Sequence, residues 1–494
     1  MHRRILFLGF LLTATSLCAE SVVQGGLPSP QQRPADFAAL GASAFQSQKD
    51  EFLSSKGVWI KCAPDTCGST ATDWGADSMT YAFYLYWRTT HDNSIGPIME
   101  ELSQRQPTYT ASINQWSDVP VWDSIAQSRI YSITQNPNAL SKAKSGFAFV
   151  DSFKASSFAA GACPSINYQQ PGGGRNKLKT LETDANYVKA ALLLYESTQD
   201  GRYLNKAINK YDAIRRYFLD PHVPLYTVYV FDDGSRCVQM PGRFYASVNG
   251  TMISNGYDLY RLTQSVNYRS DALETAMAVQ SHLTDSTGIF VDLQAENDVV
   301  EPLVEAMFTL ASDDGQSFAR NWILTNADAM ASATRPDGSY SRFFNGPANA
   351  SSVTIWQTNG GYALQYAAAK IKPAGLPQDP DYWNGARSVP MDLKMTSTAR
   401  SFTFNGKAIA IFGTLGEYCC EDGHARIFVD GVETFDKSGI WQNKSSSSAK
   451  LSNSILFAWR WPKSGMHTIS IEPGIPNAKE GGSYFHMTGY DVVP

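Results

Sequence analysis

Helical stretches recur along this chain, and six of them begin with a short segment rich in acidic, amide or aromatic side chains. One such segment would be an ordinary helix start, because Asp, Ser, Thr and Asn commonly cap helix N-termini. Six in succession indicate a repeated helical hairpin, in which each unit must stack on its neighbours to bury its apolar face. The six helix openings are residues 73–77, 116–118, 181–184, 248–250, 294–298 and 356–359.

A second repeated phrase marks where hairpins turn. The pattern Tyr-x-x-Thr-Gln occurs at residues 131–135, 195–199 and 260–264, and each occurrence precedes another helical run. Six helical hairpins that close on themselves form an (α/α)6 toroid. We therefore expect the six openings to meet at one end of such a toroid.

The periodicity changes after a proline-rich stretch. Residues 373–390 contain four prolines and read as a linker. Beyond them apolar and polar residues alternate with period two, which is typical of strands, and Asp430-Gly431 is a strong hairpin turn. The sequence predicts a multidomain chain: an all-α (α/α)6 domain at residues 34–372, the linker, and a small all-β, jelly-roll-like sandwich at residues 391–494.

The composition narrows the class of protein. The 494 residues carry a net charge of −5, and Lys and Arg are dispersed, so a nucleic-acid partner is not predicted.

The N-terminus has Arg3 and Arg4, a short apolar run and Leu17-Cys18-Ala19, which together are typical of a secretory signal peptide ending at residue 19. No later stretch is long and apolar enough to cross a membrane. We expect a secreted, extracellular protein.

Six cysteines remain after the predicted cleavage, and an even number in a secreted chain favours disulfides. Cys62 with Cys67 would close a small loop, and Cys163 with Cys237 would join two long ones. The pairing of the adjacent residues Cys419 and Cys420 stays open. Glycosylation sequons stand at Asn249, Asn349 and Asn443, although Asn249 lies in a helix opening and is a doubtful acceptor.

The openings carry the groups that glycoside hydrolysis needs. That reaction uses two carboxylates, one to protonate the leaving oxygen and one to attack or to activate water, and their separation of roughly 5 Å or 6.5–9.5 Å sets the stereochemical outcome. Asp118 is the best single candidate, because Trp116 and Trp122 flank it and Pro120 fixes the first turn of the following helix. The helix dipole would favour its ionised form and hence a nucleophile or base. The alternative is that Asp118 is only an N-cap.

The other candidates for reacting and substrate-binding residues are less distinctive in the sequence. Glu182 and Glu296 are unusual capping residues and are candidates for the acid, whereas Asp184 is more easily a cap. Asp232-Asp233-Gly234 follows a strand-like segment and is more often a hairpin turn. The remaining substrate-binding candidates are the polar and aromatic side chains of the openings, namely Asp73, Trp74, Asp77, Trp116, Trp122, Asn249, Asp298, Trp356 and Gln357.

The helical region resembles glycoside hydrolase family 76, a family of secreted (α/α)6 α-mannanases. The likeness rests on residues 249–253 with 257–263, which look like that family's fourth hairpin, and on residues 326–329 with Asp337-Gly338, which look like the end of its fifth. The family carries an adjacent Asp-Asp pair on its second inner helix, as nucleophile and acid/base. Here the matching stretch is residues 117–122, and it retains only Asp118.

These observations predict a secreted glycoside hydrolase that cleaves a polysaccharide, related to but distinct from the α-mannanases, with no cofactor and no metal. The C-terminal segment resembles galactose-binding-like sandwiches. Two alternatives remain. A polysaccharide lyase on the same toroid could use Tyr187, Tyr245, Asn186 or Asn249, and a toroid that has lost a carboxylate could bind glycans without turnover.

Overall fold

The computed structural model describes most of the chain after the predicted signal peptide. Residues Pro34 to Pro494 group into one compact unit that contains both the helices and the large sheet. The description covers residues 36–64, 70–71, 74–105, 116–155, 158–174, 177–240, 242, 244–291, 299–348, 352–395, 398–415, 424–434, 440–442, 451–473 and 485–494.

Among the described residues, six helices form a closed inner ring. Each contacts the next along the chain, and the last packs back on the first. Most of their residues are buried on every side, as expected for helices enclosed by others. They are α2 (Trp74–Thr90), α4 (Val119–Thr134), α6 (Leu181–Thr198), α8 (Ala246–Thr263), α10 (Glu301–Ser312) and α12 (Ile355–Ile371).

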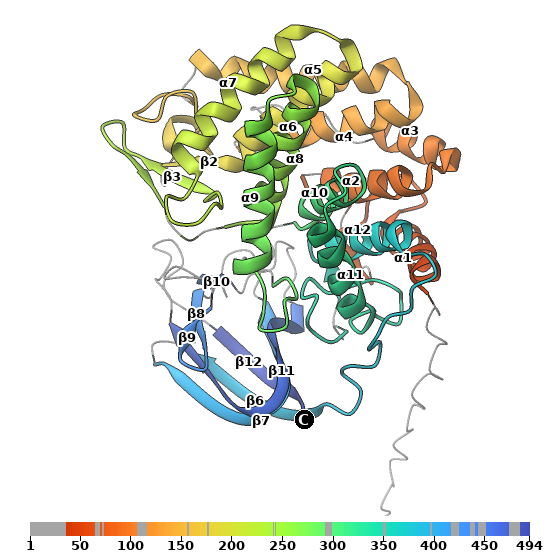
Figure 1. The fold of residues 1–494 in the computed structure, drawn as a ribbon, viewed down its shortest axis with the longest axis vertical. Coiled ribbons are helices and arrows are strands. Elements are labelled where there is room, and N and C mark those ends of the chain that lie inside the picture. Colours follow the sequence, from red (N-terminus) through yellow and green to blue (C-terminus); the bar gives the residue numbers. More distant parts are fainter. Residues whose placement is uncertain are drawn as a thin grey trace, which may run out of the picture. The chain divides into compact units, whose positions relative to one another are not determined.

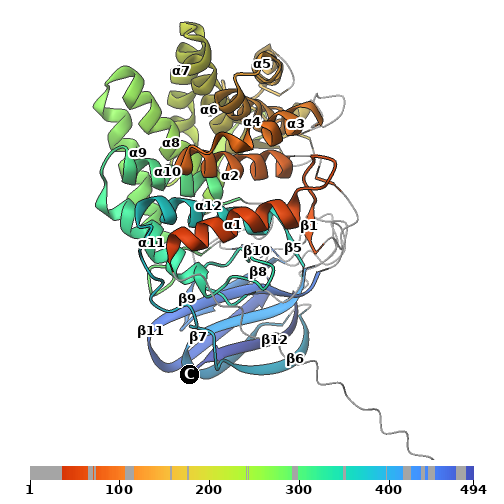
Figure 2. The same ribbon diagram turned by 90° about the vertical axis from the view of Figure 1, so that its right-hand side faces the viewer.

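The other helices in the described part of the chain pack outside this ring (Figure 1). The outer helices α5, α7, α9 and α11 each pack on the inner helix that precedes them, while α3 packs on α4. The first helix, α1, packs on α12 and so completes the sixth hairpin (Figure 2). They are α1 (Phe37–Phe52), α3 (Gly96–Arg105), α5 (Pro137–Asp151), α7 (Gly201–Phe218), α9 (Val266–His282) and α11 (Ser317–Ala331). The predicted (α/α)6 toroid is confirmed.

The repeated Tyr-x-x-Thr-Gln phrase has a local structural reason. Its glutamine is the residue at which an inner helix ends, and Gln135, Gln199 and Gln264 all adopt left-handed φ angles of 55°, 57° and 61°. The backbone N–H of each bonds to the carbonyl of the phrase's tyrosine. A left-handed residue at this position is a common helix ending, and it reverses the chain within two residues. The phrase therefore encodes the hairpin turn.

The C-terminal strands form one antiparallel sheet in the order β10-β8-β11-β7-β12-β6, with β9 paired to β8. The Asp430-Gly431 turn is confirmed, since Val429 pairs with Val432 and both turn residues have positive φ. This arrangement agrees with the predicted β-sandwich. The strands are β6 (Arg387–Met395), β7 (Arg400–Leu415), β8 (His424–Val429), β9 (Val432–Glu433), β10 (Ile440–Gln442), β11 (Leu451–Pro473) and β12 (Phe485–Val493).

Short strands support the loops around the helices. β2 (Leu178–Thr180), β3 (Tyr229–Asp232) and β4 (Cys237–Gln239) form a small sheet, and β1 (Cys62–Ala63) pairs with β5 (Val353–Thr354). The turn predicted at residues 232–234 is confirmed, since it joins β3 to β4. Residues 387–390, at the end of the predicted linker, belong to β6. The domain division itself stays a prediction.

Three of the four cysteines with a predicted disulfide partner are described by the structure, and all three are disulfide-bonded. Cys163 and Cys237 form a disulfide with a Cα–Cα distance of 5.4 Å. Cys62 is also disulfide-bonded, while its predicted partner Cys67, and Cys419 and Cys420, lie outside the described residues. Within the described ranges, no helix is long and apolar enough to span a membrane.

Candidate functional site

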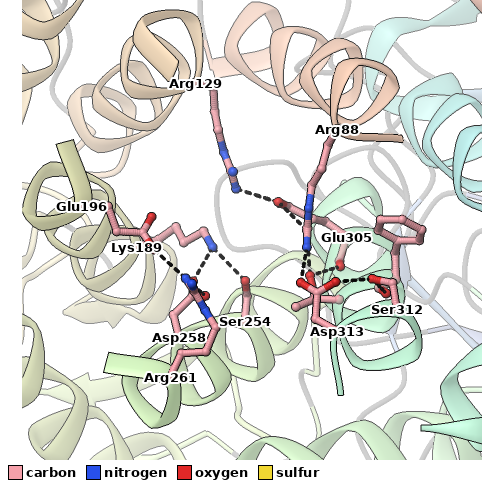
Figure 3. A network of polar contacts seen from close by, with 12 residues as sticks. Arg88, Arg129, Lys189, Glu196, Ser254, Asp258, Arg261, Glu305, Ser312 and Asp313 are labelled. Carbon is pink, nitrogen blue, oxygen red and sulfur yellow. Dashed lines mark hydrogen bonds and ion pairs between the residues drawn. The ribbon is translucent and has the colours of Figure 1, made fainter. Parts of the chain in front are cut away.

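Charged side chains from five inner helices meet at the centre of the ring (Figure 3). Arg129 of α4 bonds both carboxylate oxygens of Glu305 on α10, at 2.8 and 2.9 Å. Arg88 of α2 also reaches Glu305, at 3.3 Å. Lys189 of α6 pairs with Asp258 of α8 at 2.8 Å. These pairs identify the faces of the inner helices that point into the ring. We call this group the central charge layer.

The central charge layer contains Glu305 as a buried carboxylate. Burial alone would raise its pKa, but Arg129, Lys189 and Arg88 outweigh that effect and hold the pKa below its usual range. Glu305 is therefore held as a carboxylate at neutral pH.

Carboxylates of four inner helices lie above this layer, toward the N-terminal ends of those helices, and Asp77 of α2 precedes Arg88 by about three helical turns. Asp118 precedes Arg129 by about three helical turns, and Glu182 precedes Lys189 by about two. Glu301 lies about one turn before Glu305. Residues separated by whole turns share one face of a helix. Since the lower members point into the ring, this periodicity directs Asp77, Asp118, Glu182 and Glu301 toward the same axis at the same end.

Asp118 is not used as an ordinary helix cap. Its backbone is helical, with φ −79° and ψ −32°. In the described part of the chain its side chain does not accept the capping hydrogen bond that an N-cap residue takes from the second or third amide of its helix. Burial raises the pKa of Asp118 to about 6, although bonds from the backbone amides of Asp118 and Val119 partly offset the rise. The dipole argument from sequence predicted the opposite direction. It fails because the desolvation of a carboxylate that is only 8% exposed outweighs the field of one helix end.

The openings of α4 and α6 are joined by a direct hydrogen bond. The Oγ of Ser117 and the Oγ1 of Thr183 lie 2.5 Å apart and are both buried. Asp118 follows Ser117, and Glu182 precedes Thr183, so each carboxylate is one residue from this bond. Glu182 is partly exposed and lies in the first turn of α6, whose N-terminus is capped by Thr180. The structure thus brings these two sequence candidates to adjacent helix ends.

Three other candidates are held by contacts within the protein. Both oxygens of Asp184 accept bonds from Asn167, and Lys210 lies 2.7 Å from Oδ1. Asn249 bonds the backbone N–H and carbonyl of Tyr226 and is fully buried. Gln357 forms the capping box that starts α12. Such contacts favour structural roles for Asp184, Asn249 and Gln357, and their functional assignments stay predictions.

The tryptophans differ in exposure. Trp122 is 2% exposed and packs edge-on against Tyr81, so its ring offers little surface to a ligand. Trp356 is 3% exposed and contacts Trp74 with ring centroids 5.5 Å apart. Trp74 and Trp116 are each partly exposed. These two rings are therefore better placed than Trp122 or Trp356 to stack on a sugar.

The remaining sequence candidates lie at the other openings. Asp77 is in the first turn of α2 and is 1% exposed. The predicted residues Asp73, Glu296 and Asp298 lie outside the described residues. Among the residues that are described, no group of three or more His, Cys, Asp or Glu side chains is arranged to hold a metal ion.

Sequence reasoning missed a buried polar group that connects three openings. Ser78 of α2 donates a 2.6 Å hydrogen bond to Oε1 of Glu301 on α10, and Asn359 of α12 donates to Ser78. All three residues are fully buried. The spacing of Glu301 and Glu305 on one helix face was a signal that both point into the ring, but nothing in the sequence identified Ser78 as their neighbour.

Asp123 is a second buried carboxylate on α4, and it points away from the ring axis. Its neighbour Gln127 accepts a bond from Ser103 of the outer helix α3. Oδ2 of Asp123 has no hydrogen-bond partner among the described residues, and burial raises the pKa of Asp123 to about 7. The side chain is therefore largely protonated at pH 5 and ionised at pH 8.

This raised pKa predicts a pH-dependent effect of the Asp123→Asn substitution. Between pH 3.8 and about 7 the unfolded chain releases a proton that the folded protein keeps, so wild-type stability falls as pH rises through this window. The cost reaches at most about 4 kcal/mol above pH 7. Asn removes it, so Asp123→Asn should be more stable than wild type at pH 8 and not at pH 4.

Urea unfolding at both pH values checks this expectation, with Asp50→Asn on the exposed face of α1 as the matched control. A stability difference between Asp123→Asn and wild type that does not change with pH would show that folding does not raise the pKa of Asp123.

Comparison with known proteins gives the fold but not the family. No protein-family model matches the chain, and no curated protein sequence matches it. Among solved structures, it is similar to an α-1,6-mannanase of glycoside hydrolase family 76 from Salegentibacter sp. HEL1_6, with 19% identity and a TM-score of 0.60. The match covers 68% of this chain and 100% of that one. That protein was an inactive variant, with two adjacent aspartates replaced, in complex with α-1,6-mannotetrose.

A second similar structure is a family 76 mannosidase from Bacteroides thetaiotaomicron, with 15% identity and a TM-score of 0.56 over 68% of this chain and 98% of that chain. At these identities the likeness concerns the (α/α)6 fold. The arrangement of the inner and outer helices in this chain is that of the family 76 glycoside hydrolases.

Proposed function

We propose that this protein is a secreted glycoside hydrolase that cleaves an α-linked mannan-type polysaccharide, with Asp118 and Glu182 as its two reacting carboxylates. The observation that carries the proposal is the Ser117–Thr183 hydrogen bond, which places these carboxylates at adjacent helix ends above the central charge layer. The similarity to mannanases that bind α-1,6-mannooligosaccharides supports the substrate class.

Asp118 fits the role of the acid/base group. With a pKa of about 6, a large share of its carboxyl groups carries the proton needed by a leaving glycosidic oxygen at pH 5–6. Glu182 would then attack the anomeric carbon or activate water. The distance between the two groups on the substrate-bound protein decides between retention and inversion. The adjacent Asp-Asp pair of family 76 is not retained in this chain. In this assignment Glu182, from the next inner helix, takes the role of the missing second aspartate.

The aromatic rings of Trp74 and Trp116 fit the same proposal. Both are partly exposed at openings of inner helices. Aromatic rings present an apolar face of the kind on which the C–H faces of a pyranose can stack. They would hold the chain on either side of the reacting bond.

The first experiment is a screen of the purified mature protein against α-mannans and other polysaccharides, reading new reducing ends together with ultraviolet absorbance. Reducing ends from an α-mannan without added absorbance would support the proposal. Absorbance that rises with the ends would instead identify a lyase, because β-elimination leaves an unsaturated product. Glycan binding without either signal would favour a binding protein.

The lyase alternative draws less support from the described contacts. Tyr187, which could act as its base, donates a 2.5 Å hydrogen bond to Asp151 and is 2% exposed. Its pKa lies far above the usual range, mainly because of burial and the neighbouring Asp151. Both ends of the Asn249 amide are bonded to backbone groups. Tyr187 is therefore not poised to take a proton from a uronic acid, and the Asn249 amide is not free to bind its carboxylate.

A further inference from the structure

The sheet domain reaches the toroid through a buried arginine. Arg460 of β11 is 4% exposed, yet its Nε donates to the carbonyl of Asn345 at 2.7 Å and its Nη2 to Ser332 at 3.0 Å. The ring of Tyr382 lies 3.9 Å from its guanidinium carbon. Burial lowers the pKa of Arg460, although Tyr382 and Asp285 oppose the shift. Burying a charged side chain costs free energy of hydration, so a buried arginine requires hydrogen-bond or charged partners.

Asp285 connects the same site to a second loop. Its Oδ1 accepts bonds from Thr287, while its Oδ2 accepts from Asn345 Nδ2 at 2.9 Å and from the backbone of Arg460 at 3.3 Å. The Nδ2 of Asn345 also donates to the carbonyl of Ala458 in β11. Arg460, Asn345 and Asp285 thus form one buried cluster, which we call the latch.

The latch fixes the two loops that lead into α10 and α12. Asp285 lies in residues 283–291, which follow α9 and precede α10, and Asn345 lies in residues 340–348, which follow α11 and precede α12. The rings of Phe290 and Phe344, one from each loop, lie 5.6 Å apart. The two loops are therefore packed on each other as well as on the sheet.

A short packed path runs from the latch to the ring axis. Phe344 precedes Asn345, and a Cβ added at Gly360 would meet both Val300 and the Phe344 ring. Val300 precedes Glu301, and Gly360 follows Asn359. Tyr340 donates its backbone N–H to Thr358 of α12 at 3.0 Å. The latch consequently supports the backbone that positions Glu301 and Asn359.

We propose that the sheet domain is a positioning element of the glycan site rather than a separate binding module. Arg460 is the positioning residue, and through the two loops it places the α10 and α12 side of the site against the sugar residues that do not react. The inference deepens the proposed function and rests on it for its kinetic part. Its structural part, the loss of order in the two loops without Arg460, does not depend on any substrate.

The test is Arg460→Met in the full-length protein, with Arg426→Met as a matched control. Arg426 also lies on this sheet, but it pairs with Glu433 and Glu472 at the surface. Amide hydrogen exchange without substrate should become at least about tenfold faster in residues 283–291 and 340–348 of Arg460→Met, since local opening is governed by the contacts that close it. Unchanged exchange in these loops would overturn the inference.

The kinetic readout separates positioning from general destabilisation. Asp118 and Glu182 lie on α4 and α6, outside the latch, so KM for an α-mannan should rise at least about tenfold while kcat changes less than about threefold. A loss confined to kcat would contradict the positioning role.

If Arg460→Met fails to fold, Ser332→Ala is the second variant. It removes one hydrogen-bond acceptor of Arg460, and it should also raise both the exchange rate of the two loops and KM. A wild-type protein without hydrolytic activity would refute the proposed function and leave the exchange result to decide the inference.

Discussion

Replacing Asp118 by Asn is expected to lower turnover of an α-mannan by about 10³-fold or more, because an amide can neither donate the proton to the leaving oxygen nor accept one back. The substitution keeps the size and shape of a side chain that is 8% exposed at the start of α4. Binding of the glycan should survive, so the loss should fall on kcat. Initial rates of reducing-end release, with circular dichroism to check the fold, measure it.

The pH dependence of the hydrolysis rate provides an independent test of the role of Asp118. If Asp118 acts as the acid with a pKa of about 6, the wild-type rate should fall as pH rises through 6, since the required proton is lost there. Asp123→Asn is the matched control, because it changes a carboxylate on the same helix that points toward the outer helix α3. It should keep turnover within about threefold of wild type, as expected of a group that does not touch the reacting atoms. Rates in Asp118→Asn equal to wild type would eliminate Asp118 as a reacting group.

The parts of the fold that depend on local sequence could be predicted. The Thr-Gln endings at residues 134–135, 198–199 and 263–264 require only a left-handed residue at the end of a helix, which is a property of a few neighbouring residues. The change from period 3.6 to period two at the proline-rich stretch separated helices from strands for the same reason. The hairpin at Asp430-Gly431 follows from the backbone preferences of the two turn residues alone.

The candidate site could be predicted only in part, because the partners of its residues are distant in the sequence. Asp118 was recognisable from its flanking residues, but its burial and raised pKa depend on how six helices close. Asp184 was also a candidate from the sequence, although more easily a cap, and its carboxylate is bonded to Asn167 and Lys210. The bond from Ser78 to Glu301 joins residues 223 positions apart. The family resemblance also indicated Asp118 as a candidate, but it could not indicate which helix would supply the second carboxylate that the proposal requires.

The central charge layer also explains why a ring of helices can carry carboxylates above its core. Arg129 bonds both oxygens of Glu305 and lies over the rings of Tyr84 and Tyr81, at 4.0 and 5.1 Å from their centroids. It spans from α4 to α10 across the ring axis. The layer therefore fixes the separation of opposite inner helices directly below the carboxylates that the proposed chemistry requires.

Arg129→Met is expected to lower the free energy of unfolding by about 3–5 kcal/mol, since it leaves Glu305 buried with Arg88 as its remaining arginine partner. Urea unfolding measures the loss. The exposed pair Arg105–Glu101 of α3 is the matched control, and Arg105→Met should cost less than about 1 kcal/mol. Combining Arg129→Met with Glu305→Leu should restore part of the stability, because no uncompensated charge then remains at that position. If the double variant were as unstable as the sum of the two single ones, the two side chains would contribute independently, and the ion pair would not be what couples α4 to α10.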